Sequence, residues 1–270
     1  MRWKIASQLL FALTMIAIGI IGLVSGGFAP IWAGVPKSLP DRQLLAYLCT
    51  FISLACGASL LARRTVAPAA LLLFVYLLVW TALFKFPFII RQPLVEVSYQ
   101  SNGENAVLIA GAWVLYASNA RDRASAFLNF LGGPTGLRIA YLLYGLALVA
   151  FGFSHFAYLE FTAPLVPVWM RAPVFWAYLT GGIYLVTGLL LVSGFAARLG
   201  ALLSAVQIAL ITLLVWGPMV MAGQLSAEHW QETIVSWALT AAALVVAASF
   251  DGRPWMFERG QSSAPAALAS

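Results

Sequence analysis

The chain consists largely of long apolar stretches separated by short polar ones. A helix that crosses a membrane needs about 20 mostly apolar residues, so such stretches predict membrane-spanning helices. The first stretch lacks a convincing small-x-small cleavage site after it, so we interpret it as a retained span and not as a signal peptide. The eight predicted spans are 5–25, 44–62, 66–90, 105–119, 138–158, 174–193, 198–222 and 233–250.

The sequence partly matches itself when it is shifted so that Gly57 falls on Gly188, and we call this alignment the repeat register. The two glycines lie within the second span of each copy, and Pro87 falls on Pro218 late in the third. Other matches in the repeat register are Val35-Pro36 with Val166-Pro167, Ala46-Tyr47-Leu48 with Ala177-Tyr178-Leu179 and Ala70-Leu71-Leu72 with Ala201-Leu202-Leu203. Self-similarity at a fixed spacing indicates an internal duplication. The duplication is also the reason to keep 105–119 as a span, although it is short and follows charged residues.

The predicted fold class is an all-α membrane protein with eight transmembrane helices, built as two tandem four-helix bundles. Four spans return the chain to the side where it entered, so the repeat is parallel and both units have the same orientation. The first unit covers 1–118 and the second covers 138–252. A cytoplasmic linker at 119–137 contains Gly132-Gly133-Pro134, which is typical of a turn, and 253–270 is a cytoplasmic tail.

Composition supports a membrane protein. Hydrophobic residues make up 62% of the 270 residues and charged residues 9%, against roughly 45–50% and about 25% in soluble domains. These values exclude a soluble globular protein and a disordered chain. The net charge of +6 is explained by the surplus of Lys and Arg in cytoplasmic loops. We therefore predict membrane lipids, and no nucleic acid, as partners.

The placement of basic residues predicts an orientation. Lys and Arg concentrate on the cytoplasmic side of membrane proteins, and here they are more numerous on the side that holds the N-terminus. We expect a multi-pass protein of the bacterial plasma (inner) membrane with both termini in the cytoplasm. The residues expected on the cytoplasmic side are Arg2, Lys4, Arg63, Arg64, Arg121, Arg123, Arg138, Arg198, Arg253 and Arg259.

Cys49 and Cys56 lie two helical turns apart in one predicted helix. That spacing corresponds to about 10.5 Å along a helix axis, whereas a disulfide needs Cα atoms within about 7 Å. We predict two buried free thiols. With two histidines in the chain, no multi-histidine haem site is evident, and no ligand spacing predicts a metal site. The sequence carries no phosphate-binding or serine-hydrolase motif.

The loop after the opening helix of the second unit is dense in prolines and aromatics. One interpretation is a hairpin that packs at the outer surface of the membrane, because prolines end helices and aromatic residues suit the headgroup level. The other is a lid over a pocket between helices, with His155 and Glu160 inside it. Trp169 and Arg171 lie in the same loop and belong to the same candidate ligand site.

Lys85 lies within the third predicted span. An ionisable residue inside a membrane is a functional candidate. We prefer a structural interpretation, because Lys85 lies about one turn from the outer end and its stem can extend to the interface. The matching residue of the second unit is Trp216, which is also typical of an interface.

The outer loop before the last span contains His229 and Glu232. One interpretation is that Glu232, like Asn105 in the first unit, begins a helix, where an acid interacts favourably with the helix dipole. The alternative is that His229 and Glu232 meet His155 and Glu160 at one outer mouth. Such a mouth would pass protons or bind a polar headgroup.

The second unit carries a pattern of glycines, prolines and aromatics: Gly152, Ser154-His155-Phe156, Val166-Pro167, Trp169, Trp176 to Gly181, Gly188 and Gln231 to Thr240. This pattern resembles the DoxX-like family of bacterial membrane proteins, best over 138–250 and more weakly over 5–118. DoxX-like proteins are four-helix membrane modules named for a small subunit of a thiosulfate:quinone oxidoreductase. The resemblance implies a quinone as cofactor and an oxidoreductase subunit as partner, but it implies no catalytic residues.

Three functions follow as hypotheses. The first is a membrane subunit or anchor of a quinone-linked redox system, without independent catalytic activity. The second is a transporter of a small solute or lipid with a binding pocket at its outer face. Few ionisable residues at mid-membrane count against a proton- or ion-coupled carrier. The third is a membrane enzyme with His155 or His229 as base, for which no nucleophile spacing is visible.

Overall fold

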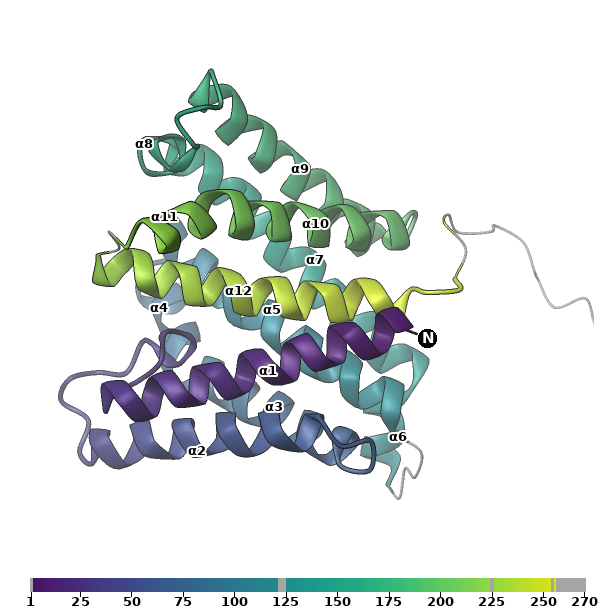
Figure 1. Ribbon diagram of the computed structural model, residues 1–270. Helices are drawn as coiled ribbons and strands as arrows, with labels where there is room; N and C mark the ends of the chain where they lie inside the picture. The colour runs from purple at the N-terminus through teal and green to yellow at the C-terminus, as the bar shows by residue number, and fades with distance from the viewer. Residues whose placement is uncertain (1, 121–124, 224–225, 254, 256–270) are drawn as a thin grey trace, which may run out of the picture.

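The computed structural model describes residues 2–120, 125–223, 226–253 and 255, and over these residues the chain is mostly helical (Figure 1). Seven helices of this described part are long and apolar enough to cross a membrane, and each overlaps a predicted span. They are α1 (Arg2–Ser25), α2 (Arg42–Leu60), α3 with its continuation (Val66–Arg91), α7 (Pro134–Ala157), α9 (Pro173–Ser193), α10 with its continuation (Ala197–Ala222) and α12 (Ala227–Ser249).

An eighth long helix, α5 (Glu96–Asn119), contains the predicted span at 105–119. It has 24 residues, as many as α1, but its first half is rich in polar residues. Glu96 and Glu104 both lie in that half, whereas most residues of the second half are buried. The remaining short elements are η1 (Pro30–Trp32), α6 (Ala126–Gly132), α8 (Leu159–Thr162) and η3 (Ala163–Leu165).

Two predicted helix starts are wrong. Asn105 lies inside α5 and is fully buried, and Glu232 lies inside α12, which begins at Ala227. Ser226 caps α12, because its hydroxyl accepts a hydrogen bond from the backbone N–H of His229 at 3.2 Å. The apolar stretches identify where a helix crosses the core, whereas the polar first turns extend each helix further.

The predicted linker is mostly helical. Within 119–137, α6 and the first turn of α7 account for most residues, and Ser125 caps α6. Residues 121–124 and nearly all of the predicted tail at 253–270 lie outside the described residues.

Two helices contain a π-helical turn in the second half of their length. The turns are η2 (Thr81–Lys85) after α3 (Val66–Trp80) and η4 (Thr212–Trp216) after α10 (Ala197–Ile211). In η2 the N–H of Phe86 donates to the carbonyl of Thr81, five residues back. Pro87 and Pro218 follow the turns, and a proline clashes with the carbonyl four residues back, which favours the wider turn. The continuations are α4 (Phe86–Arg91) and α11 (Gly217–Ala222).

Several helix starts recur in the repeat register. Val66, Thr81, Phe86 and Glu96 begin α3, η2, α4 and α5, and the residues aligned with them begin α10, η4, α11 and α12. The start of α2 and the start of α9 are aligned in the same way. The register found in the sequence is therefore also the register of these element boundaries.

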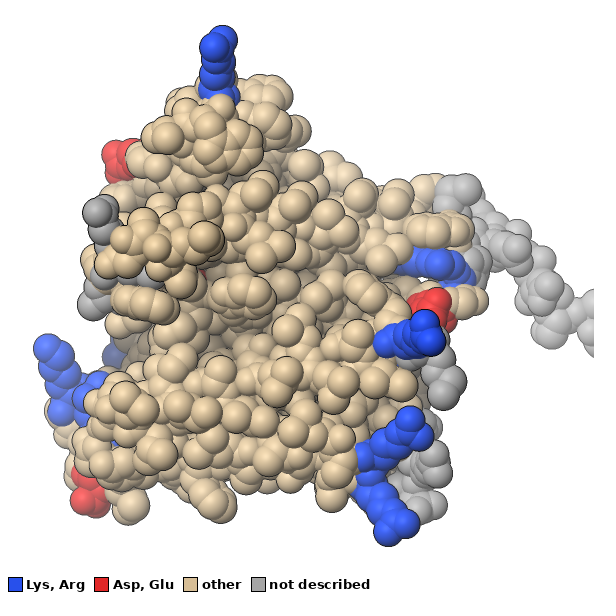
Figure 2. All heavy atoms as spheres, viewed as in Figure 1, with Lys and Arg blue, Asp and Glu red and all other residues tan. Residues whose placement is uncertain are grey.

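The last helix of each half packs against the opposite half. The helix α5 contacts α7 as well as α3, and α12 contacts α1 as well as α10. In Figure 1, α12 runs between α10 and α1. The helices α5 and α12 also contact each other, so they form the centre of the molecule. On the face shown in Figure 2, charged side chains gather near the helix ends and leave an uncharged band between them, as expected for a membrane-embedded protein.

Candidate functional site

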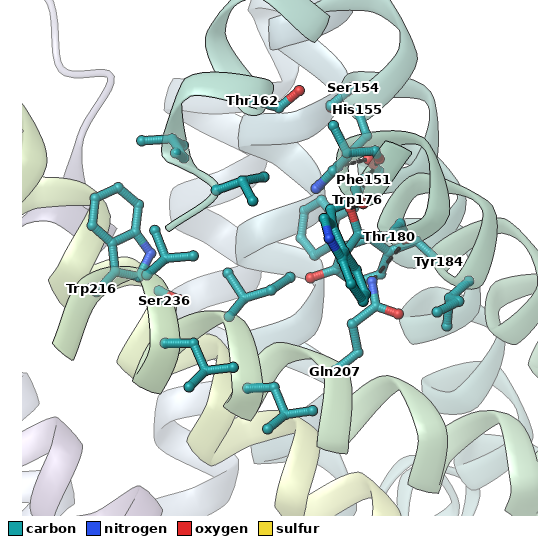
Figure 3. A pocket seen from close by; sticks show the side chains of 18 of the residues that line it. Phe151, Ser154, His155, Thr162, Trp176, Thr180, Tyr184, Gln207, Trp216 and Ser236 are labelled. Atoms are coloured by element: carbon teal, nitrogen blue, oxygen red, sulfur yellow. Dashed lines mark hydrogen bonds between the residues drawn. The ribbon is translucent and has the colours of Figure 1, made fainter. Parts of the chain in front are cut away.

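A cavity of about 480 Å³ lies in the second half of the chain, between α7, α9, α10 and α12 (Figure 3). This volume lies in the range of small-molecule sites, roughly 300–1,000 Å³. Most of its wall is apolar, and the segment after α7 covers it with Thr162, Leu165, Val166 and Met170. This placement favours the lid interpretation of that loop over a hairpin that packs only on the outer surface.

One side of the cavity opens along α10. Leu203, Val206 and Leu210 line the cavity, and each keeps between 44% and 54% of its surface exposed. They follow one another at helical spacing, so they form a single apolar strip on that helix. An apolar strip that is both exposed and cavity-lining provides a route from the lipid-facing surface into the site.

His155 is held in one tautomer at the end of α7. Its Nδ1 lies 2.8 Å from the carbonyl oxygen of Phe151, and its ring packs against Tyr184 at 5.3 Å between centroids. A carbonyl oxygen only accepts, so Nδ1 carries the hydrogen and Nε2 is the acceptor of the neutral ring. His155 lines the cavity, and Nε2 is the ring nitrogen that can accept a hydrogen bond from a ligand there.

Gln207 of α10 provides a second acceptor. Its Nε2 donates to the carbonyl of Thr180 on α9 at 2.9 Å, which fixes the amide against the cavity wall (Figure 3). Gln207 is 7% exposed, and its Oε1 is buried without a hydrogen-bond partner. A buried polar atom without a partner costs about 1–3 kcal/mol, so a ligand that donates to this oxygen would be stabilised.

Lys85, Glu104 and Glu232 gather at the boundary between the two halves. The Lys85 ammonium lies 3.8 Å from Glu104 Oε2 and donates to the carbonyl of Ser101 at 3.2 Å. Lys85 is 3% exposed and the Glu104 side chain 16%. The interpretation that Lys85 extends to the membrane surface is therefore wrong. The π-helical turn places it against α5, whose polar first half provides its partners.

A smaller cavity of about 190 Å³ adjoins this charged cluster. Its wall contains Lys85, Glu104 and Glu232, and the last two also line the larger cavity, as do Gln100 and Val235. The carboxylates of Glu104 and Glu232 thus lie between the two spaces. They bring ionisable groups to one end of an otherwise apolar site.

The fourth helix of each half bonds to a π-helical turn. Asn105 Nδ2 of α5 donates to Thr81 Oγ1 at 2.9 Å, and the hydroxyls of Thr212 and Ser236 of α12 lie 2.6 Å apart. Asn102 Nδ2 also donates to the Lys85 carbonyl at 3.1 Å. These bonds satisfy polar groups in and beside the wide turns, so the turns are stable within the apolar core.

The structure brings together some of the predicted site residues and separates others. His155 and Glu232 line the larger cavity, and Lys85 lines the smaller one. Glu160, Trp169 and Arg171 are exposed and do not line the larger cavity. His229 packs its ring against Trp216, which lines the cavity, at 6.1 Å between centroids. The predicted outer mouth formed by His155, Glu160, His229 and Glu232 is therefore not assembled as a single cluster.

Sequence reasoning missed Glu104 and Gln207 as site residues. The signal for Glu104 is an acid within a predicted helix next in sequence to the one that holds Lys85, since adjacent antiparallel helices bring such charges together. Gln207 is a polar residue within a long apolar stretch. Cys49 and Cys56 are buried free thiols, as predicted.

No group of three His, Cys, Asp or Glu side chains placed to hold a metal occurs among the residues that the structure describes. Comparison with family models, with curated proteins and with solved structures finds no match for this chain. A proposal for the function of this chain therefore rests on the geometry of its cavities and side chains.

Proposed function

We propose that this chain is a binding subunit of a membrane redox system, and that its larger cavity holds the head of a quinone-like lipid. The observation that carries the proposal is the cavity itself. Its walls are apolar, it opens along α10 to the lipid-facing surface, and acceptors from His155 and Gln207 lie in its wall. Ligand sites of this kind combine an apolar pocket with a few placed polar groups.

The proposed architecture is eight membrane-spanning helices in two tandem four-helix units. The recurrence of element starts and of the two π-helical turns in the repeat register supports the duplication. The length of α5, 24 residues or about 36 Å, supports an eighth span between its neighbours. The proposal keeps the DoxX-like resemblance, the bacterial inner membrane and cytoplasmic termini, which rest on the sequence.

Native mass spectrometry of the protein in a mild detergent tests the ligand. We expect a quinone or its reduced quinol form bound to the intact chain, and Ile183→Trp, which fills the cavity from α9, to remove it. Val186→Trp is the control, because Val186 lies on the same helix, is 57% exposed and does not line the cavity. Wild-type protein without a bound quinone or quinol would contradict the proposal, as would equal content of this ligand in both variants.

A carrier for a lipid or small solute is the second candidate. The buried pair of Lys85 and Glu104 favours it, because ion-coupled carriers keep such charges inside the membrane. The same spectra distinguish the two candidates. Phospholipid in place of quinone, lost in Ile183→Trp and kept in Val186→Trp, would favour the carrier.

A further inference from the structure

Five aromatic rings fill the core of the first half: Phe28, Trp32, Tyr76, Trp80 and Phe84. Trp32 lies within the cluster, with ring centroids 5.2 Å from Tyr76 and 5.3 Å from Trp80. It is 1% exposed, and its indole N–H donates to Ser53 Oγ at 3.0 Å. The side chain comes from the loop after α1 and enters the bundle between α2 and α3.

The second half has a non-aromatic residue at four of the five matching positions. In the repeat register, Gln207, Ile211 and Val215 stand where Tyr76, Trp80 and Phe84 stand in the first half. The short helices η1 (Pro30–Trp32) and η3 (Ala163–Leu165) correspond to each other, and this pairs Trp32 with Leu165. All four replacements line the larger cavity.

The cavity thus corresponds to the volume that aromatic rings occupy in the first half. The indole of Trp32 is a planar two-ring system that donates one hydrogen bond. At its place in the second half, the smaller side chain of Leu165 leaves space. Gln207 Oε1 is buried without a partner, and His155 presents an acceptor nitrogen. Both groups call for a ligand that donates.

We infer that the larger cavity binds a planar, fused two-ring head that carries hydroxyl donors, in the position that the Trp32 indole occupies in the first half. This inference rests on the proposed function and names its ligand class. Among quinone-like lipids it selects the reduced, hydroxyl-bearing form with a naphthalene ring. The oxidised form has only carbonyl acceptors, and these cannot satisfy the acceptors of Gln207 and His155.

Two probes with the same naphthalene ring test the donor requirement. 1-Naphthol has a hydroxyl donor, whereas 1-methoxynaphthalene has only an acceptor. We expect the purified full-length protein to bind 1-naphthol about tenfold more tightly, because an unsatisfied buried acceptor is costly. Titration of empty detergent micelles corrects for partitioning. Gln207→Leu should reduce the preference to about twofold or less. Equal affinity of the wild-type protein for the two probes would overturn the inference.

Leu165→Trp tests the position. Restoring the tryptophan of the first half should weaken 1-naphthol binding at least tenfold. Val168→Trp is the control, because Val168 lies in the same loop, is fully exposed and does not line the cavity. Unchanged binding in Leu165→Trp would overturn the inference. If the native protein still carried a quinone or quinol that Ile183→Trp removed, the proposed function would stand although the inference about the ring system had failed.

Discussion

Lys85 is a buried cation whose charge is matched by carboxylates of two other helices. Its ammonium lies 3.8 Å from Glu104, and Glu232 lines the same small cavity. Removing one partner of a buried ion pair leaves an uncompensated charge and costs about 3–5 kcal/mol. Replacing both partners together costs much less. The Lys85 side chain therefore matters more for its charge than for the volume of its stem.

We expect Lys85→Met to lower the free energy of unfolding by about 3 kcal/mol, seen as a lower thermal midpoint in detergent. The double variant Lys85→Met with Glu104→Gln should recover much of this loss. Lys37→Met is the matched control, because Lys37 is exposed. An unchanged thermal midpoint in Lys85→Met would contradict the conclusion that the buried Glu104 carboxylate needs the Lys85 ammonium as its partner.

At this scale the sequence identified Lys85 as noteworthy but not its environment. Distance from the end of a helix predicts whether a lysine stem can extend to the interface. This distance does not reveal the π-helical turn, which directs Lys85 toward α5. It also does not reveal that the polar first half of α5 provides the partners of the ammonium group. The cavity could not be predicted from the sequence either. Its size depends on the loop after the first helix of each half, which supplies Trp32 to the core in the first half and a smaller side chain in the second.

The second helix of each half meets the first at a glycine. A Cβ on Gly188 of α9 would lie 2.7 Å from the carbonyl oxygen of Gly145 and 3.0 Å from the nitrogen of Val149, both on α7. A Cβ on Gly57 of α2 would lie 2.9 Å from the carbonyl oxygen of Ala12 on α1. Small residues let membrane helices approach closely, since packing is the main force between them.

We expect Gly188→Ala to separate α7 from α9 and to cost about 1–3 kcal/mol, as overpacked positions do. Gly182→Ala on the same helix is the control, because a Cβ there meets nothing within 4 Å. Thermal midpoints in detergent compare the two variants. If Gly188→Ala were as stable as Gly182→Ala, the conclusion that α7 and α9 need a glycine at their contact would be wrong.

Helix positions were the most predictable feature of this fold. The length of the apolar stretches predicted the central part of each of the seven apolar helices, and the repeat register aligns the starts of five pairs of elements. Helix ends were less predictable. The polar first turns of α5 and α12 carry charges that resemble loops in a hydropathy pattern, so their starts at Glu96 and Ala227 lay well before the spans predicted at 105–119 and 233–250.

In the whole molecule, the two halves are joined through their fourth helices. Gly111 of α5 faces Ala242 of α12, and a Cβ on Gly111 would lie 2.9 Å from the Ala242 Cβ. The exchange of contacts, α5 with α7 and α12 with α1, was not visible in the sequence. A repeat predicts similar units but does not specify which unit each helix packs against.

A cysteine pair tests this contact. In a chain with Cys49→Ala and Cys56→Ala, we expect Gly111→Cys with Ala242→Cys to form a disulfide on oxidation, since a small shift brings the two Cβ atoms to the roughly 3.5–4.5 Å that the bond requires. After cleavage at a protease site placed between the halves, the fragments should migrate together only without reductant. Gly111→Cys with the exposed Leu213→Cys is the control. Separate fragments from the first pair would contradict the central contact.

The contact between α1 and α12 also sets the order in which the chain matures. The helix α1 leaves the ribosome long before α12, which covers it, so one flank of α1 stays in contact with lipid or chaperone until α12 has been made. Contacts between distant parts of a chain form late, because a long loop must close first. A chain that stops before α12 therefore leaves this flank of α1 uncovered. The synthesis of α12 thus completes the packing of the first helix to be made.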